Sequence, residues 1–253
     1  MEIWIILLVV ILAAMVHASF HLSISVLTLL SGHTLSKKKS HLQLTKLSMS
    51  LVFGSVFATI LIFSTFAYFA GIFYNIAFSK VAWAVLAGIL VAAGISTWIF
   101  YYRRGKNIQN GTELWIPRSM AKFLNERASK TVHSAEAFSL GIVSVLSEIL
   151  FYFASLAISA ILVSRVSLAH QFAILVIYVL ISNLPIFSIA CMISGGHPIS
   201  EIQAWRNKNK RFMQFSAGLG MIILAFITGV VIFTPEFLGL TTTTSSPVNP
   251  ILQ

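Results

Sequence analysis

Acidic residues are scarce in this chain of 253 residues, which contains seven glutamates and no aspartate. Charged residues make up only 9% of the total and apolar residues 57%, whereas soluble domains carry about 25% charged residues. This balance excludes an ordinary soluble domain and predicts an all-α protein that lies in a membrane. The single cysteine, Cys191, excludes an internal disulfide and a dithiol redox cycle within the chain, and we expect it to be a small packing residue.

Long uncharged stretches take the place of the missing charges. A membrane-spanning helix needs about 20 apolar residues. Six windows meet this length, and they are 3–36 (interrupted by His17 and His21), 47–79, 81–102, 137–164 (interrupted by Glu148), 166–200 and 212–235. We therefore predict six transmembrane helices. The first window resembles a secretory signal peptide. The residues that precede the window include Glu2 and contain no Lys or Arg, which argues against such a signal, so we expect an uncleaved helix.

The basic residues predict how these helices are oriented. Fifteen of the 17 lysines and arginines fall in the first, third and fifth loops, which lie on one side of the membrane. Only Lys80 and Arg165 fall in loops on the other side. Cytoplasmic loops are enriched in basic residues, so these three loops are predicted to be cytoplasmic and both termini to lie outside. We expect a multi-pass protein of the cell's inner (plasma) membrane. Because topology accounts for the net charge of +10, no nucleic-acid partner is expected.

The two halves of the chain resemble each other weakly. Aligning His17 with Glu148 also matches Phe20 with Phe151. Each half would hold three helices, and an odd number makes the second half insert upside down, which predicts inverted-topology repeats with a site near the midplane. The predicted parts are a first three-helix repeat, a basic cytoplasmic loop, a second three-helix repeat and a disordered tail, at 1–102, 103–136, 137–236 and 237–253 respectively.

The loop at 103–136 contains a predicted amphipathic helix. Its narrow apolar face is formed by Met120, Phe123 and Leu124. The basic residues around this face are Arg118, Lys122, Arg127 and Lys130. Such helices lie on the inner leaflet of a membrane and contact anionic lipid headgroups, which is the role we expect here. Binding of a cytoplasmic partner is the alternative for this loop.

Proline and glycine within the windows predict where helices bend and where they approach each other. Pro185 has no N–H and therefore frees the carbonyl of Ile181, which Ser182 or Asn183 can satisfy. This pattern predicts a plain kink or, as the functional alternative, a hinge formed by Asn183 and Pro185. Close-packing positions are predicted at Gly54, Gly71, Gly88 and Gly94.

Three ionisable residues lie in the central parts of the apolar windows, namely His17, His21 and Glu148, whereas the other histidines in the windows lie near their ends. An ionisable side chain near mid-bilayer costs several kcal/mol unless it faces a polar interior or a partner. His17 and His21 are four residues apart and share a helical face, a spacing that lets two imidazoles bind one transition metal. Glu148 could be the third ligand or the counter-charge. Hydroxyl groups of Ser19, Ser144 and Tyr152 are predicted to lie in the same substrate or ion site.

The fifth window carries a family resemblance. It contains Tyr178, Asn183, Pro185 and Phe187, and this pattern resembles the YxxGxxxPF helix of the transmembrane thiol-disulfide electron carriers of cytochrome c maturation. Those carriers belong to the lysine-exporter superfamily, which also contains amino-acid and metal-ion exporters. The resemblance covers about residues 8–234 and implies helices arranged around a central site.

The chain departs from that family at the redox centre. The resemblance places the two PCxxP motifs of the family on residues 17–21 and 148–152, where Ala18 and Ile149 occupy the cysteine positions. Electron carriage is therefore not expected. A central cavity can remain, and ionisable groups now stand at it.

Together these features predict an integral membrane transporter of a small solute or cation, with a polar midplane site on the first and fourth helices. His17, His21 and Glu148 would bind a cation or relay protons, and a transition-metal ion is one substrate they could take, with no resident cofactor expected. Two alternatives stay open. The three side chains could be a structural pairing between helices, or the protein could be a non-transporting scaffold or assembly protein whose loop binds a partner. No enzyme activity is expected, since the chain shows no hydrolase motif and no thiol pair.

Overall fold

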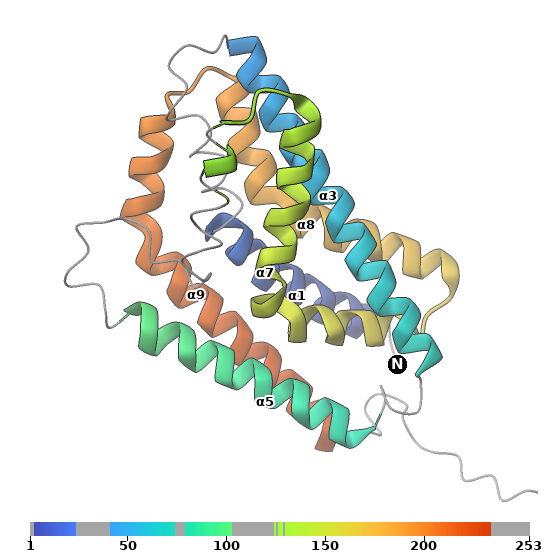
Figure 1. Cartoon of the computed structure of the whole chain (residues 1–253). Helices are drawn as coiled ribbons and strands as arrows, with labels where there is room; N and C mark the ends of the chain where they lie inside the picture. The colour runs from blue at the N-terminus through green and yellow to red at the C-terminus, as the bar shows by residue number, and fades with distance from the viewer. Residues whose placement is uncertain are drawn as a thin grey trace, which may run out of the picture.

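The computed structural model describes residues 3–23, 41–73, 79–102, 124, 126–128 and 130–233. Helices account for nearly all of these residues, and no strand occurs in these ranges (Figure 1). The elements are α1 (Ile3–Ser23), α3 (His41–Ile72), α5 (Lys80–Ser96), the π-helical turn η1 (Thr97–Tyr102), α7 (Ser134–Val163), α8 (Leu168–Ser194) and α9 (Ile199–Phe233). The prediction of an all-α protein is confirmed for this part of the chain.

Five of these helices are long and apolar enough to cross a membrane, namely α1, α3, α5 continued into η1, α7 and α8. They correspond to the first five predicted windows. The sixth differs, because α9 begins in a polar stretch at Ile199 and its apolar part, Phe215–Val230, is shorter than the roughly 20 residues that a span needs. Five such helices are the architecture of a multi-pass helical membrane protein.

Side chains at two helix starts satisfy backbone N–H groups that have no partner inside the helix. At the start of α5, the Ser79 hydroxyl accepts a hydrogen bond from the N–H of Ala82 at 3.1 Å. At the start of α7, the Glu136 carboxylate accepts from the N–H of Val132 at 3.1 Å and of His133 at 3.4 Å. These bonds fix the residues at which two apolar helices begin.

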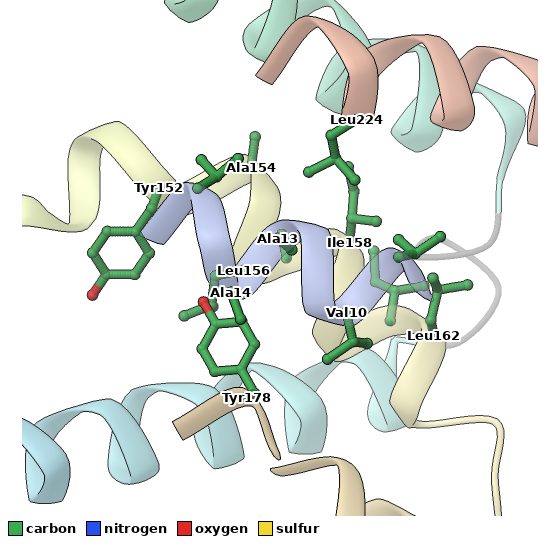
Figure 2. Close-up of a cluster of buried hydrophobic side chains, with 14 of the residues drawn as sticks. Val10, Ala13, Ala14, Tyr152, Ala154, Leu156, Ile158, Leu162, Tyr178 and Leu224 are labelled. Atoms are coloured by element: carbon green, nitrogen blue, oxygen red, sulfur yellow. The ribbon is translucent and has the colours of Figure 1, made fainter. Parts of the chain in front are cut away.

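Helices of the first half pack mainly against helices of the second half. α3 contacts α7 and α8, α1 contacts α7, α8 and α9, and α5 with η1 contacts α9. α7, α8 and α9 each change direction part-way along (Figure 1). Figure 2 shows Val10, Ala13 and Ala14 of α1 among side chains from three helices of the second half, namely Tyr152, Leu156, Ile158 and Leu162 of α7, Tyr178 of α8 and Leu224 of α9. α1 thus packs against all three helices of the second half.

Glycines set the closest helix crossings. A Cβ at Gly54 of α3 would collide with the carbonyl of Phe138 in α7, and a Cβ at Gly141 of α7 would collide with the backbone of α3. α5 and α9 approach at Gly94 and Gly218, where a Cβ on Gly94 would lie 3.0 Å from the Gly218 carbonyl oxygen. Small residues at membrane-helix interfaces let backbones approach in this way. The packing roles predicted for Gly54 and Gly94 are confirmed.

Three predictions about small or loop residues are wrong. Gly71 and Gly88 are exposed, and no side chain or neighbouring helix among the described residues lies within 4 Å of a Cβ placed on either. Cys191 is exposed on α8 and is not packed inside the protein. In the loop at 103–136, Leu124 is buried in a cluster with Ile202 and does not face lipid headgroups. Residues 103–123 of that loop, the basic residues there and the tail at 237–253 lie outside the described residues.

Large apolar side chains cover the outside of the bundle. On α3 and α8, they include Phe53, Phe57, Leu61, Leu180, Leu184 and Phe187. A soluble monomer exposes few large apolar patches, because water penalises them. Contact with lipid chains accounts for these residues, so the bilayer is the environment that the outer surface requires.

Candidate functional site

Three ionisable side chains meet at one buried point between α1 and α7. His17 and His21 come from α1 and Glu148 from α7, and all three are 0% exposed. The His21 Nδ1 atom lies 2.9 Å from the Glu148 Oε2 atom. One ligand atom from each of the three residues lies within 4.8 Å of the other two. The two helices therefore bring together the histidines and the acid, which are separated by more than 120 residues along the sequence.

The four-residue spacing of the histidines produces a stack of rings. His17 and His21 lie one helical turn apart, with ring centroids at 4.4 Å and planes inclined by 21°. The Tyr152 ring stacks on His17, with centroids at 3.6 Å and planes inclined by 17°. These contacts hold the imidazole of His17 in one orientation inside the core.

Tyr178 of α8 completes the group, and we call His17, His21, Glu148, Tyr152 and Tyr178 the polar cluster. The Tyr178 hydroxyl lies 3.1 Å from the Nδ1 atom of His17, and both residues are fully buried. The other ring nitrogen of His17, Nε2, is buried and has no hydrogen-bond partner among the described residues. A buried nitrogen of this kind normally has a partner, so the His17 Nε2 atom is available to a ligand.

The predicted hydroxyl groups differ in their surroundings. The Tyr152 hydroxyl donates to the Val145 carbonyl at 3.4 Å, within α7. Ser144 is fully buried one turn before Glu148, and its hydroxyl has no hydrogen-bond partner among the described residues. Ser19 is only partly buried and donates to the Val16 carbonyl of its own helix at 2.6 Å. Ser144 and Tyr152 therefore lie on the inner side of α7 with Glu148, while the participation of Ser19 in a shared site stays a prediction.

A second polar group lies between α3 and α8, and we call Ser55, Thr59, Ser182 and Asn183 the α3–α8 network. The Ser55 hydroxyl donates to the Asn183 Oδ1 atom at 2.8 Å, and the Asn183 Nδ2 atom lies 3.4 Å from the Thr59 hydroxyl. All four residues are buried. The amide of Asn183 thus joins the predicted hinge of α8 to α3.

Pro185 lies inside α8, as predicted, and α8 continues through it. The hydroxyl of Ser182 and the amide of Asn183 both donate to the carbonyl of Val179, at 3.2 and 3.0 Å. The acceptor is therefore Val179 and not Ile181 as the proline position suggests. Asn183 reaches back a full turn, and Ser182 three residues, which are the usual ranges of such bonds in a helix.

Four members of these groups are not among the site residues predicted from the sequence, namely Tyr178, Ser55, Thr59 and Ser182. Tyr178 contributes to the sequence-based prediction only through the family resemblance, and Ser182 only as a hydroxyl that can satisfy the carbonyl freed by Pro185. A usable signal was present, because a tyrosine in an apolar helix needs a partner for its hydroxyl. Ser55 and Thr59 give no such signal, since hydroxyls in membrane helices commonly bond to their own backbone, as Thr59 does to the Ser55 carbonyl at 2.9 Å.

No family model, curated protein or solved structure matches this chain. The resemblance to the lysine-exporter superfamily and its electron carriers therefore stays a prediction.

Proposed function

We propose that this protein transports a small cation across a membrane, with the polar cluster as the translocation site. The observation that carries the proposal is the meeting of His17, His21 and Glu148 at one fully buried point within 4.8 Å. All three belong to helices that are long and apolar enough to span a bilayer. Ionisable groups inside membrane helices are costly and mark ion or solute pathways by default.

The donor groups suit a cation better than an anion. The carboxylate of Glu148 supplies negative charge, and the Nε2 atom of His17 supplies a buried acceptor position with no partner in the described structure. The hydroxyl of Ser144, one turn from Glu148, offers a further buried oxygen. A cation entering this point would replace the water it loses with oxygen and nitrogen donors.

The proposed architecture is six spans in two inverted three-helix repeats, with both termini outside. The helix contacts support it, because most of them fall into corresponding pairs when the halves are exchanged. Under this exchange the contact of α1 with α8 corresponds to that of α7 with α3, and the contact of α1 with α9 to that of α7 with α5. The apolar part of α9, Phe215–Val230, would be the sixth span, with local thinning of the bilayer making up for its length.

Four members of the polar cluster, all except Tyr178, are related in pairs by the same exchange. The alignment that pairs His17 with Glu148 also pairs His21 with Tyr152. The stacking of His17 on Tyr152 therefore has a counterpart in the contact of Glu148 with His21. A site made from equivalent positions of two inverted repeats is where transporters of this design bind their substrates.

Movement of the site is assigned to α8. Pro185 interrupts the backbone hydrogen bonding of this helix, and Asn183 ties the same region to α3. A few residues that absorb a change of backbone angle are sufficient for a hinge. Rotation at this point would move Tyr178 and, through its contact with His17, change the orientation of the imidazole ring.

Flux into proteoliposomes tests the proposal. Purified protein is reconstituted, and uptake and efflux of divalent metals, cationic amino acids and protons are measured for the wild type, Glu148→Gln and His17→Gln. His170→Ala is the matched control, because His170 is an exposed histidine that bonds to Ser167 outside the polar cluster. We expect flux of one cation class in the wild type and the control, and its loss in the two cluster variants. Absence of flux for every solute in well-folded protein overturns the proposal.

A structural role for the cluster is the second candidate. The direct contact of His21 with Glu148 at 2.9 Å favours it, since a paired histidine and carboxylate can join two helices without binding anything else. If this alternative holds, Glu148→Gln and His17→Gln lower the midpoint of thermal unfolding, and the wild type shows no flux of any solute. The protein would then be a scaffold, and the basic loop at 103–136 would be the place to search for a partner.

A further inference from the structure

We infer that the polar cluster binds a single divalent first-row transition-metal ion, coordinated by His17, His21 and Glu148. The inference rests on the proposed function for its role, since the metal would be the transported cation. Its structural basis is independent of transport. Two imidazoles and one carboxylate lie with one ligand atom each within 4.8 Å of the others, fully buried from solvent.

The environment of His17 prepares it as a ligand. Its Nδ1 atom faces the Tyr178 hydroxyl at 3.1 Å, so that nitrogen is already engaged, and its Nε2 atom has no partner among the described residues. Metal-binding histidines use one ring nitrogen for the metal and the other for a supporting hydrogen bond. Tyr178 holds the ring in the orientation that presents Nε2, and the Tyr152 ring stacked on His17 restricts its rotation.

The spacing of the donors fits a metal after a small rearrangement. With metal–ligand bonds of about 2.1 Å, tetrahedral donors lie about 3.4 Å apart. The widest pair here is at most 4.8 Å apart and must close by up to about 1.4 Å, whereas the His21 Nδ1 and Glu148 Oε2 atoms, 2.9 Å apart, must open by about 0.5 Å. Rotation of the imidazole and carboxylate side chains can supply a movement of this size. The three donors leave at least one coordination position open, which suits an ion that must also leave.

The donor types select the class of metal. Calcium and magnesium prefer sites made of oxygen atoms alone, whereas two imidazoles favour zinc, cobalt, nickel, iron or copper. Copper(I) prefers thiolates and thioethers, and the one cysteine of the chain, Cys191, is exposed on α8 and is not among the three donors. The buried carboxylate also offsets part of the charge of a divalent ion. A divalent first-row metal is therefore the ligand that this donor set recognises.

Metal titration of the full-length protein tests the inference. The protein is purified without a polyhistidine tag and kept in lipid nanodiscs. Zn²⁺ is titrated by calorimetry and Co²⁺ by its visible absorption, which reports coordination geometry. We expect one ion per chain in the wild type and in His170→Ala. We expect binding to be lost in His17→Gln and Glu148→Gln, and to weaken by about 10–100-fold in Tyr178→Phe, the usual effect of removing a supporting hydrogen bond.

A measurement on the wild type alone covers the case in which a variant does not fold. The X-ray absorption spectrum of the Zn²⁺-loaded wild type should show two imidazole ligands and no sulfur. A site with one histidine or none overturns the inference, as does binding that is unchanged in folded His17→Gln and Glu148→Gln. Failure of the two proposals can be told apart. Metal bound at this site without any flux overturns transport alone, whereas flux of another cation without metal binding overturns the metal site alone.

Discussion

Phe20 of α1 stacks on Phe151 of α7, with ring centroids 5.4 Å apart and planes inclined by 15°. Each phenylalanine lies three residues after an ionisable member of the polar cluster, His17 in one case and Glu148 in the other. In the alignment of the two halves, Phe20 and Phe151 are equivalent positions, and they touch each other. In the proposed arrangement of two inverted repeats, equivalent residues touch where they lie beside the axis that relates the repeats, so this stack would place that axis next to the polar cluster.

The stack should couple the two phenylalanines energetically. Phe20→Ala and Phe151→Ala are each expected to lower the free energy of unfolding, and the double variant to lower it by about 0.5–1.5 kcal/mol less than the sum, the usual value for an aromatic pair. Unfolding in mixed detergent micelles measures the cycle. Phe53→Ala, at an exposed phenylalanine of α3, is the control that should not couple with Phe20. Strict additivity of Phe20→Ala and Phe151→Ala would contradict the stack.

The contact between His21 and Glu148 should behave as a pair in a second cycle. Glu148→Ala removes the carboxylate that His21 contacts at 2.9 Å and is expected to destabilise the protein by about 1–3 kcal/mol. His21→Ala should have a similar effect, and the double variant should lose less than the sum. Glu148→Gln keeps a hydrogen-bonding group of the same size and should stay within about 1 kcal/mol of the wild type. A destabilisation by Glu148→Gln as large as that by Glu148→Ala would show that the contact depends on charge.

The glycine crossing between α3 and α7 should not accept a methyl group. Gly54→Ala and Gly141→Ala each place a Cβ against the backbone of the other helix, so we expect losses of about 1–3 kcal/mol or more. Gly88→Ala is the matched control in α5, where the added methyl meets no atom of the described residues within 4 Å, and it should be neutral or stabilising by about 0.5–1 kcal/mol. Thermal unfolding of the purified variants measures the difference. Equal midpoints for Gly54→Ala and Gly88→Ala would show that the crossing is looser than the structure has it.

Pro185 should govern the rate of movement and not the affinity of the site. Pro185→Ala restores an N–H that can bond to the Ile181 carbonyl and stiffens α8. We expect turnover to fall about tenfold, equivalent to about 1.4 kcal/mol on the barrier, with cation affinity unchanged. The two quantities are measured separately, by flux and by titration. Leu184→Ala, at the neighbouring exposed position, is the control and should change neither. An unchanged turnover in Pro185→Ala would leave only a static kink.

The proposed orientation can be tested by cysteine labelling, because Cys191→Ser alone gives a cysteine-free background. Lys80→Cys and Lys130→Cys then place single thiols at exposed positions that the proposed topology puts on opposite sides. A maleimide that does not cross membranes should label Lys80→Cys in intact cells and Lys130→Cys only after permeabilisation. Labelling of both from the same side would rule out the arrangement with both termini outside.

The features that the sequence predicts best are those whose pattern lies within one helix. The spacing of His17 and His21 predicted a shared face, and their rings are stacked in the structure. Glu148 was linked to them only by aligning the halves. Tyr178 could not be linked in this way, because its contact with His17 joins residues 161 positions apart and periodicity reports only neighbours along one helix.

The extent of α9 was the least predictable part of the fold. Hydropathy finds the apolar residues of a helix but not the polar turns that precede them. The stretch from Ile199 to Phe212 is rich in lysine, arginine and asparagine, most of which are compatible with helix, so α9 begins well before the window at 212–235. Leu124 was assigned to the lipid surface for the related reason that a short apolar face does not specify what covers it.

In the proposed inverted repeats, the contact of His21 with Glu148 and the contact of His17 with Tyr152 are equivalent in position but differ in chemistry. In a transporter made of inverted repeats, the inward-open and outward-open states arise when the halves exchange conformations. Identical halves would make the two states equal in free energy. One contact joins an imidazole to a carboxylate, and its counterpart joins an imidazole to a phenol ring. When the halves exchange conformations, each contact would take on the surroundings of the other, so the two states would differ in free energy. The unloaded protein would therefore have a preferred side, and the cargo would have to supply differential affinity to reverse that preference.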